Sequence, residues 1–265
     1  MVLNSNQGFE KSLVGGPEHL ATSVGRSRKF IKKTTRRWRP PPWGRERGAG
    51  QGFSQAAVQA LAYALEAKDP YTSEHSIRVR CYAVAMARIA GWRDDKLEGL
   101  GVAAEVHDIG KIAVPLPILH KNGPLTKEEY AQIMIHTEAG ARILEPVFPE
   151  GHVAIDVVRW HHERIDGRGP GGLKGSEIPL AAKLVCVADA FDAMTTTRPY
   201  RRPLTPNNAV LELNKYAGKQ FDRVCVELLE EILPKEDGFF VLPNLGCPTI
   251  RSEIEAGGYR GHAAT

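Results

Sequence analysis

The sequence predicts an all-α fold, a single bundle of about seven to eight helices that occupies residues 51–234. Three observations support this prediction. Apolar residues recur at helical spacing through most of that range. Helix start and stop signals separate these patterns from one another. Only residues 239–242 hint at a strand, and the chain has neither βαβ alternation nor an internal repeat.

The first three helices are predicted from apolar spacing and from the residues that end each pattern. Apolar residues recur over 53–65 until the Asp-Pro pair at 69–70 stops the helix. The second pattern covers 75–89, and Gly91 follows it as a C-terminal signal. The third pattern runs over 94–107.

Start signals precede the later helices. Thr126 and Glu129 have the Thr-x-x-Glu form of a capping box, which opens a helix that continues past His136 after an Asn-Gly-Pro loop. Four more helices are expected over residues 153–161, over residues 180–194, after Thr205-Pro206, and after the capping residue Asp222.

Composition places the chain among ordinary globular proteins. Of its 265 residues, 42% are hydrophobic and 25% are charged. No apolar run reaches the ~18 residues of a membrane-spanning helix, and no secretory signal is visible, so we expect no transmembrane segment and a cytoplasmic protein. The cysteines lack CxxC spacing, which argues against a zinc ribbon.

The two ends of the chain differ from the body. Residues 1–50 carry 11 Lys and Arg against 3 Asp and Glu, a net +8, whereas the remaining residues carry 24 against 28, a net −4. This basic, Pro- and Gly-rich segment is expected to be disordered. It is either a solvated tail or, with Trp38 and Trp43 among its cations, a segment that contacts nucleic acid or an anionic membrane. Residues 235–265 are expected to form a second tail.

Seven ligand-type side chains are spread through the body. Imidazole and carboxylate groups bind iron, manganese and zinc, and seven of them suit two ions that share a carboxylate. This pattern indicates metal-assisted hydrolysis of a phosphate ester or an amide. The residues are His75, His107, Asp108, His136, His161, His162 and Asp189.

The context of these residues supports the prediction. Asp108 follows His107 at a helix end, where one carboxylate can bridge two ions, and Lys111 can reach back toward the same site. Adjacent histidines diverge by about 100° on a helix. His161 and His162 can therefore serve one ion only near a helix end, which the following Gly-rich stretch supplies.

Two acidic neighbours admit more than one interpretation. Glu163 either accepts a hydrogen bond from a ligand imidazole or is a surface neighbour of Arg164. Asp189 lies among apolar residues, where an unpaired carboxylate is costly and a cation must compensate it. Asp192 is the rival carboxylate in the same helix, although it could instead bind a backbone group or an arginine.

The ordered motifs resemble those of the HD-GYP branch of the HD phosphohydrolase superfamily. The resemblance covers about residues 50 to 235, and the motifs that carry it are DPYTSEHSIRV, HDIGKI, ILHKNGPLT, HTEAG, HHERIDG, GLKGSEIPL and VADAFDAMTTTRPYR. The family fold is an all-helical bundle. Its known members are bacterial signalling enzymes that hydrolyse cyclic di-GMP to pGpG or on to GMP.

The resemblance also implies a dinuclear site. One metal would be held by His75, His107, Asp108 and Asp189, and the second by Asp108, His136, His161 and His162. Asp108 would bridge the two ions together with a hydroxide, and iron or manganese would suit this ligand set. Some members hold a third metal through a glutamate one turn before the first histidine, but this chain has Tyr71 there. Lys111 matches a lysine that contacts the scissile phosphate, and Arg198 and Arg201 match positions that bind substrate.

The chain departs from the family pattern in one loop. The Gly-Tyr-Pro that names the family should follow Asp-Gly-x-Gly, but residues 166–172 read DGRGPGG, without the tyrosine. The loop borders the substrate and has been implicated in partner contacts, so the substrate, its affinity and any signalling-protein partner stay open. Three hypotheses follow: a cyclic di-GMP phosphodiesterase, a phosphodiesterase for another cyclic dinucleotide, or a non-catalytic module that binds cyclic di-GMP or a partner.

Overall fold

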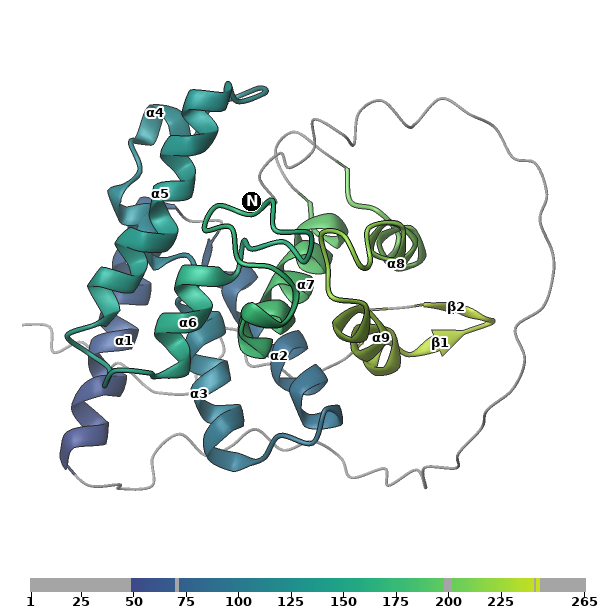
Figure 1. Ribbon diagram of the computed structural model, residues 1–265, viewed down its shortest axis with the longest axis horizontal. Helices are drawn as coiled ribbons and strands as arrows, with labels where there is room; N and C mark the ends of the chain where they lie inside the picture. Colours follow the sequence, from purple (N-terminus) through teal and green to yellow (C-terminus); the bar gives the residue numbers. More distant parts are fainter. Residues whose placement is uncertain (1–48, 70–71, 198–201, 241, 244–265) are drawn as a thin grey trace, which may run out of the picture.

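The computed structural model describes residues 49–69, 72–197, 202–240 and 242–243, and within these ranges the protein is a helical bundle (Figure 1). The all-α prediction is confirmed. The α-helices are α1 (Ala49–Lys68), α2 (Thr72–Ile89), α3 (Asp94–Glu105), α4 (Leu116–Leu119), α5 (Lys127–Leu144), α6 (Val153–Trp160), α7 (Leu180–Thr195), α8 (Pro206–Lys215) and α9 (Arg223–Ile232). Two 3-10 helices, η1 (Ile109–Ala113) and η2 (Gly175–Glu177), and two strands, β1 (Lys235–Glu236) and β2 (Phe239–Phe240), complete the described elements.

The helix ends follow the signals in the sequence. Thr126 and Glu129 form the predicted capping box at the start of α5. Thr205 accepts a hydrogen bond from the Asn208 N–H at the start of α8, and Asp222 caps α9. Gly91 takes a φ of +88° after α2, a left-handed conformation that glycine adopts without strain.

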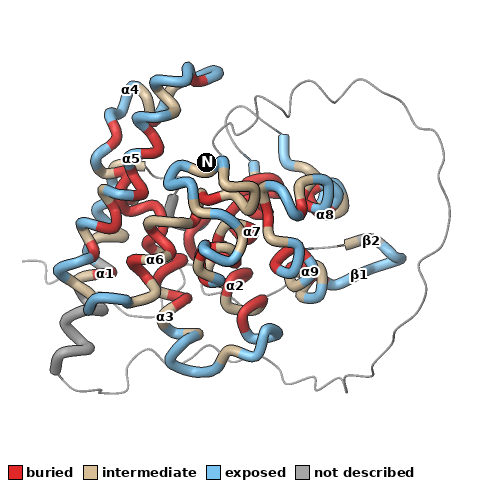
Figure 2. Tube along the Cα trace, viewed as in Figure 1, coloured by how far each residue is buried: buried red, intermediate tan, exposed pale blue. Residues whose placement is uncertain are grey.

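Most helices share one hydrophobic core. Figure 2 shows the buried residues gathered where α2, α6 and α7 come together, while the first two residues of α4 and both residues of β1 are exposed. Helix α7 is buried along nearly its whole length, because it packs against α2, α6, α8 and α9. Its high apolar content on all sides is what such a central position requires.

A smaller apolar cluster lies at one end of the bundle. It joins Val114, Leu119 and Leu125 to Ile133 and Met134 of α5. This cluster supports α4 and the start of α5, which project from the end opposite to α8 and α9 (Figure 1). The Lys68 ammonium ties α1 to the same region by donating to the carbonyl oxygens of Ile112 and Val114, at 2.5 and 2.7 Å.

The hairpin lies where the sequence hinted at a strand. Strand β2 pairs antiparallel with β1, and the Phe240 N–H donates to Asn207 Oδ1 at 2.9 Å, which fastens the hairpin to α8. Residues 235–240, assigned to the C-terminal tail from the sequence, thus pack on the bundle. The expectations for residues 1–48 and 244–265 fall outside the described residues. Among the described helices, none is long and apolar enough to cross a membrane.

Candidate metal centre

The seven predicted ligand residues come from five segments and meet inside the bundle. His75 lies on α2, His136 on α5 and Asp189 on α7. The His107-Asp108 pair occupies the turn between α3 and η1, and the His161-His162 pair follows the last residue of α6. Six of the seven are buried, and His162 is half-buried. The helix-end positions predicted for both pairs are confirmed.

The first group of donors contains His75, His107 and Asp108, whose donor atoms lie within 4.8 Å of one another. Asp189 adjoins it, because its Oδ1 is 3.1 Å from His75 Nε2. Three buried atoms here, His75 Nε2, His107 Nε2 and Asp189 Oδ1, make no hydrogen bond to any described residue. Leaving a buried polar atom unpaired costs about 1–3 kcal/mol, so three around one point fit a bound cation.

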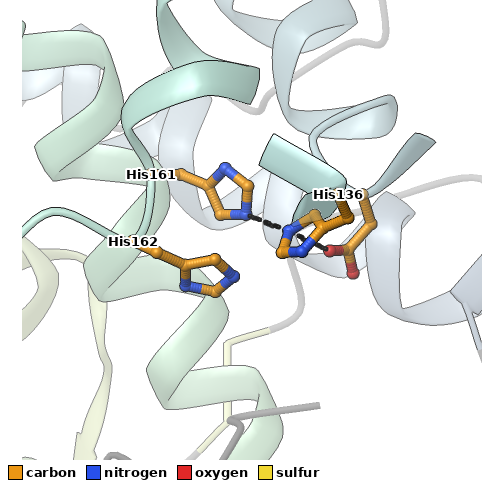
Figure 3. A group of neighbouring side chains, drawn as sticks. His136, His161 and His162 are labelled. Carbon is orange, nitrogen blue, oxygen red and sulfur yellow. Dashed lines mark hydrogen bonds and ion pairs between the residues drawn. The ribbon is translucent and has the colours of Figure 1, made fainter. Parts of the chain in front are cut away.

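The second group contains Asp108, His136, His161 and His162, again with donor atoms within 4.8 Å of one another. Figure 3 shows the three imidazoles approaching one another from two separate segments. The Nε2 atoms of His136 and His161 are 3.3 Å apart, and they lie 3.5 and 4.0 Å from Asp108 Oδ1.

Asp108 belongs to both groups and presents a different oxygen to each. Its Oδ2 lies 3.3 Å from His107 Nε2, whereas its Oδ1 faces His136 and His161. A carboxylate in this position can bind two ions through its two oxygens.

Hydrogen bonds orient the imidazoles so that Nε2 faces the cluster. In His107, His136 and His161 the Nδ1 atom lies 2.7–3.0 Å from a main-chain carbonyl oxygen, to which it donates. In His75 the acceptor is the Asp192 carboxylate, with Nδ1 2.7 Å from Oδ2. A proton held on Nδ1 leaves the Nε2 lone pair free for a metal.

Asp192 is therefore committed to a supporting role. Arg78 donates to both of its oxygens, with Nε 2.6 Å from Oδ1 and Nη2 3.1 Å from Oδ2. The sequence left Asp192 as a rival of Asp189, and the structure gives Asp192 two partners while Asp189 keeps an unpaired oxygen. Arg78 was missed, although its position three residues after His75 places both on one face of α2.

The electrostatics of the second group favour neutral imidazoles. Burial lowers the pKa of His136 to about 4 and that of His162 to about 3. Burial and the neighbouring imidazoles lower the pKa of His161 well below its usual value. Only a neutral imidazole binds a metal, so these groups keep their lone pairs available at neutral pH.

The first group differs because carboxylates surround it. Burial acts to lower the pKa of His107, but the adjacent Asp108 and nearby Asp189 outweigh it, and the pKa is raised. Burial acts to raise the pKa of Asp108, yet Lys111 and His107 hold it well below its ordinary value. The neighbouring Lys111 and His107 thus favour the ionised carboxylate of Asp108.

Lys111 reaches the cluster as its spacing predicted. Its ammonium is buried and lies 2.5 Å from Asp108 Oδ2. A fixed positive charge is therefore present beside the shared carboxylate. Arg198 and Arg201, predicted to contact substrate, and Tyr71, predicted to replace a third-metal ligand, lie outside the described residues.

Glu163 binds the main chain of the following loop, a role that neither interpretation of the sequence included. Its carboxylate is 4% exposed and accepts hydrogen bonds from the main-chain N–H groups of Gly171 and Leu173, at 2.5 and 2.9 Å. It binds no ligand imidazole and is no surface neighbour, so both expectations were wrong. A Cβ on Gly169 would lie 2.7 Å from the Glu163 Cα, and one on Gly171 would lie 2.4 Å from Trp160 Cζ3. Glycine is required at both positions for the loop to approach this closely.

A cavity of about 650 Å³ opens beside the cluster. His162 and Asp189 line one part of it, and the loop with Arg168, Gly169 and Gly171 lines another. Aromatic side chains also border it, contributed by Tyr130, Trp160 and Phe221. The cavity size is within the range of small-molecule sites, and its lining combines two of the candidate metal ligands with arginine and aromatic groups.

Comparison with known proteins assigns the chain to a family. Residues 59–224 match the family described as HD domain. A 3'3'-cGAMP-specific phosphodiesterase of Vibrio cholerae is 36% identical over 180 residues, which cover 67% of this chain and 34% of that protein. A cyclic di-GMP phosphodiesterase of Pseudomonas aeruginosa is 39% identical over 155 residues, covering 58% of this chain and 37% of its own length. A cyclic di-GMP phosphodiesterase of Thermotoga maritima is 37% identical over 182 residues, which cover 67% of this chain and 49% of that protein.

The alignments therefore span a third to a half of these relatives. Among solved structures, Bd1817 of Bdellovibrio bacteriovorus, described as a HDG"Y"P protein, superposes with a TM-score of 0.51 at 22% identity, covering 69% of this chain and 63% of that one. At this identity the likeness concerns the fold alone.

Proposed function

Because the chain belongs to the HD domain family, we propose that it is a metal-dependent phosphodiesterase that hydrolyses cyclic di-GMP to pGpG, to GMP, or to both. One observation carries the proposal: two groups of donors share Asp108, and unpaired buried atoms face the point where an ion would bind. The names of relatives aligned over part of their length point to the same class of substrate.

The proposed ligand sets divide the cluster at Asp108. One ion would bind His75, His107, Asp108 and Asp189, and the other Asp108, His136, His161 and His162. Iron or manganese is the preferred identity, because mixed imidazole and carboxylate donors at high coordination suit these metals better than four-coordinate zinc. When bound, such a pair of ions supplies Lewis acidity for attack on a phosphodiester.

The protein side chains then fix the geometry of the reaction. Asp108 sets the spacing between the two donor groups, and Lys111 carries a positive charge next to it that is available to a non-bridging phosphate oxygen. His162 and Asp189 line both the cluster and the cavity, so substrate in the cavity reaches the donors directly. Asp108, Lys111 and Asp189 are themselves buried, which strengthens their electrostatic interactions.

A second substrate has a specific observation in its favour. The Vibrio cholerae relative is named as specific for 3'3'-cGAMP, and the loop from Asp166 to Gly172, which borders the cavity, lacks the expected tyrosine. Hydrolysis of cyclic GMP-AMP in preference to cyclic di-GMP is therefore the alternative outcome of a substrate comparison.

The test combines product analysis with metal content. Wild-type protein, purified anaerobically with iron or manganese, is incubated with cyclic di-GMP and with 3'3'-cGAMP, and the products are separated by chromatography. We expect hydrolysis and two ions per chain, with both lost in Asp108→Ala. An Asp108→Ala protein as active as wild type would refute the proposal. Tight cyclic di-GMP binding without turnover, and fewer than two ions per chain, would instead identify a binding module.

A further inference from the structure

The loop at the mouth of the cavity is held in one conformation by its own hydrogen bonds. Glu163 binds the main-chain N–H groups of Gly171 and Leu173 from inside the protein. Asp166 accepts the Arg168 N–H at 3.2 Å and is itself bound by the Arg164 guanidinium. The main chain at Arg168 and just after it is thus held by hydrogen bonds to the carboxylates of Asp166 and Glu163.

Three arginines line the cavity, and two of them are committed to protein partners. Arg159 donates to Glu138 at 3.1 Å and to Glu145 at 2.8 Å. Arg164 donates to both oxygens of Asp166, at 3.0 and 2.7 Å, and to Gln220 at 3.0 Å. These guanidinium groups hold walls together and have few donors to spare.

Arg168 differs from both. Its side chain is exposed, and its guanidinium makes no hydrogen bond or close ion pair with any residue that the structure describes. The nearby acids have other partners: Glu138 is bound by Arg142 and Arg159, and Glu163 by backbone N–H groups. Asp189 faces His75, and Asp166, whose pKa the charge of Arg168 helps to lower, is bound by Arg164. A guanidinium at a cavity whose donors make no hydrogen bond to the described residues is suited to an oxyanion.

We infer that Arg168 is a specificity-determining residue that binds the phosphate of a cyclic dinucleotide that is not being cleaved. The inference rests on the proposed function and adds a residue to it. A cyclic dinucleotide carries two phosphodiesters, and the metal centre accounts for one. The cavity runs from His162 and Asp189 to the Arg168 loop, so the second phosphate meets the free guanidinium. The residue stands in the loop that lacks the expected tyrosine, where a change in recognition is most easily accommodated.

The experiment compares substrates that have two phosphodiesters with one that has a single phosphodiester. Arg168→Ala, Arg168→Lys and wild type are assayed with cyclic di-GMP, 3'3'-cGAMP and bis(p-nitrophenyl) phosphate, which has a single phosphodiester. A charge-assisted hydrogen bond is worth about 1.5–3 kcal/mol, so Arg168→Ala should raise KM for the cyclic dinucleotide by about tenfold or more. The fall in kcat should stay below about threefold. Lysine should restore part of the loss, because it keeps the charge without the fork.

Bis(p-nitrophenyl) phosphate should show a KM shift of less than about twofold in Arg168→Ala. Arg88→Ala is the matched control, because Arg88 is also an exposed arginine but lies on α2 and does not line the cavity. Equilibrium binding of cyclic di-GMP to the Arg168→Ala protein, at low and high salt, gives a readout that does not need turnover: the affinity should fall and depend less on salt than in wild type.

The outcomes separate the two proposals. If wild type neither binds nor hydrolyses any cyclic dinucleotide, the proposed function fails and this inference fails with it. If wild type is active and Arg168→Ala retains its KM for cyclic dinucleotides, only the role of Arg168 is overturned. An equal rise in KM for bis(p-nitrophenyl) phosphate would also overturn it, since that substrate has no second phosphate to lose.

Discussion

Replacing Asp192 by asparagine tests how the metal centre is held together. Asp192 is not one of the proposed metal ligands, but it accepts the Nδ1 proton of His75 at 2.7 Å and hydrogen bonds from Nε and Nη2 of Arg78. Asparagine keeps the shape and one acceptor oxygen while it removes the charge. His75 then loses the anion that fixes its ring and its tautomer.

The expected size of the effect follows from these contacts. Changing the partner of a ligand histidine typically weakens metal binding by about 10- to 100-fold. The effect should fall on the donor group that contains His75 and Asp189, because the other imidazoles are anchored by main-chain carbonyls. Breaking a fully buried ion pair costs about 3–5 kcal/mol. The Arg78 side chain is 35% exposed, so water can solvate it, and we expect a stability loss of only about 1–2 kcal/mol.

The assay is competitive chelation followed by elemental analysis. Wild type and Asp192→Asn are loaded with manganese, titrated with a chelator of known affinity, and analysed for retained metal. The variant should give up one ion at about 10- to 100-fold lower chelator strength and hold the second as wild type does. Asp156→Asn is the control, because Asp156 lies on α6 and has no part in the cluster. Two ions held with wild-type affinity would refute the reasoning, and simultaneous loss of both would show that the two groups do not act separately.

Three further perturbations probe the same centre and its loop. Removing metal with a chelator should lower the thermal unfolding midpoint, since a ligand at 100 times its Kd contributes about 2.7 kcal/mol; identical scans before and after removal would contradict this. The metal-free protein should lose stability as pH falls from about 6.5 toward 4, because unfolded imidazoles bind protons with a pKa near 6.5 whereas native His136 does so near 4 and His162 near 3. In this pH range each of these two histidines lowers the free energy of unfolding by up to about 1.4 kcal/mol per pH unit. The raised pKa of His107 offsets part of this loss. A free energy of unfolding in urea that did not change with pH would exclude the effect. Gly171→Ala should cost about 1–3 kcal/mol in chemical denaturation, since its Cβ would lie 2.4 Å from Trp160 Cζ3; unchanged stability would mean that the loop moves freely.

The helices were predictable because their signals are local. The capping box at Thr126, the Thr205-Pro206 start and the Asp222 cap depend on neighbours within four residues, and all three form. The short elements α4 and η1 were not predicted, because they carry no such local signal. Helix α4 has four residues and η1 has five, too few for a 3.6-residue period to show in the sequence. Their conformation depends on the apolar cluster beneath them.

The sequence predicted which histidines and aspartates come together in the cluster, but not the residues that support them. Metal ligands belong to few residue types, so histidines and aspartates in sequence are recognisable even when they are far apart. Asp189 and Asp192 are of the same type on the same helix, and only the packing against His75 and Arg78 tells them apart. Glu163 was misjudged because its partners are main-chain N–H groups of an irregular loop, and main-chain donors leave no mark in a sequence.

His107 indicates that protons and metals compete for the first donor group. Its pKa is raised by Asp108 and Asp189, so an imidazolium there is stabilised by the carboxylates that would otherwise face an ion. A proton bound to His107 has to leave before the imidazole can bind an ion, because a ligand imidazole is neutral. Metal uptake should therefore release protons, and acid should weaken binding at this group before it does so at His136 or His162, whose pKa values are low.

The charges around the cluster explain why loading and substrate binding should be linked. Three buried carboxylates, Asp108, Asp189 and Asp192, face two cations, Lys111 and Arg78. With neutral imidazoles the formal sum of these five charges is −1, which does not attract a phosphodiester to this point. Two divalent ions would bring the same site to +3 in an interior where charges are poorly screened. If the proposed function holds, affinity for a cyclic dinucleotide should therefore rise with metal occupancy even when no bond is cleaved.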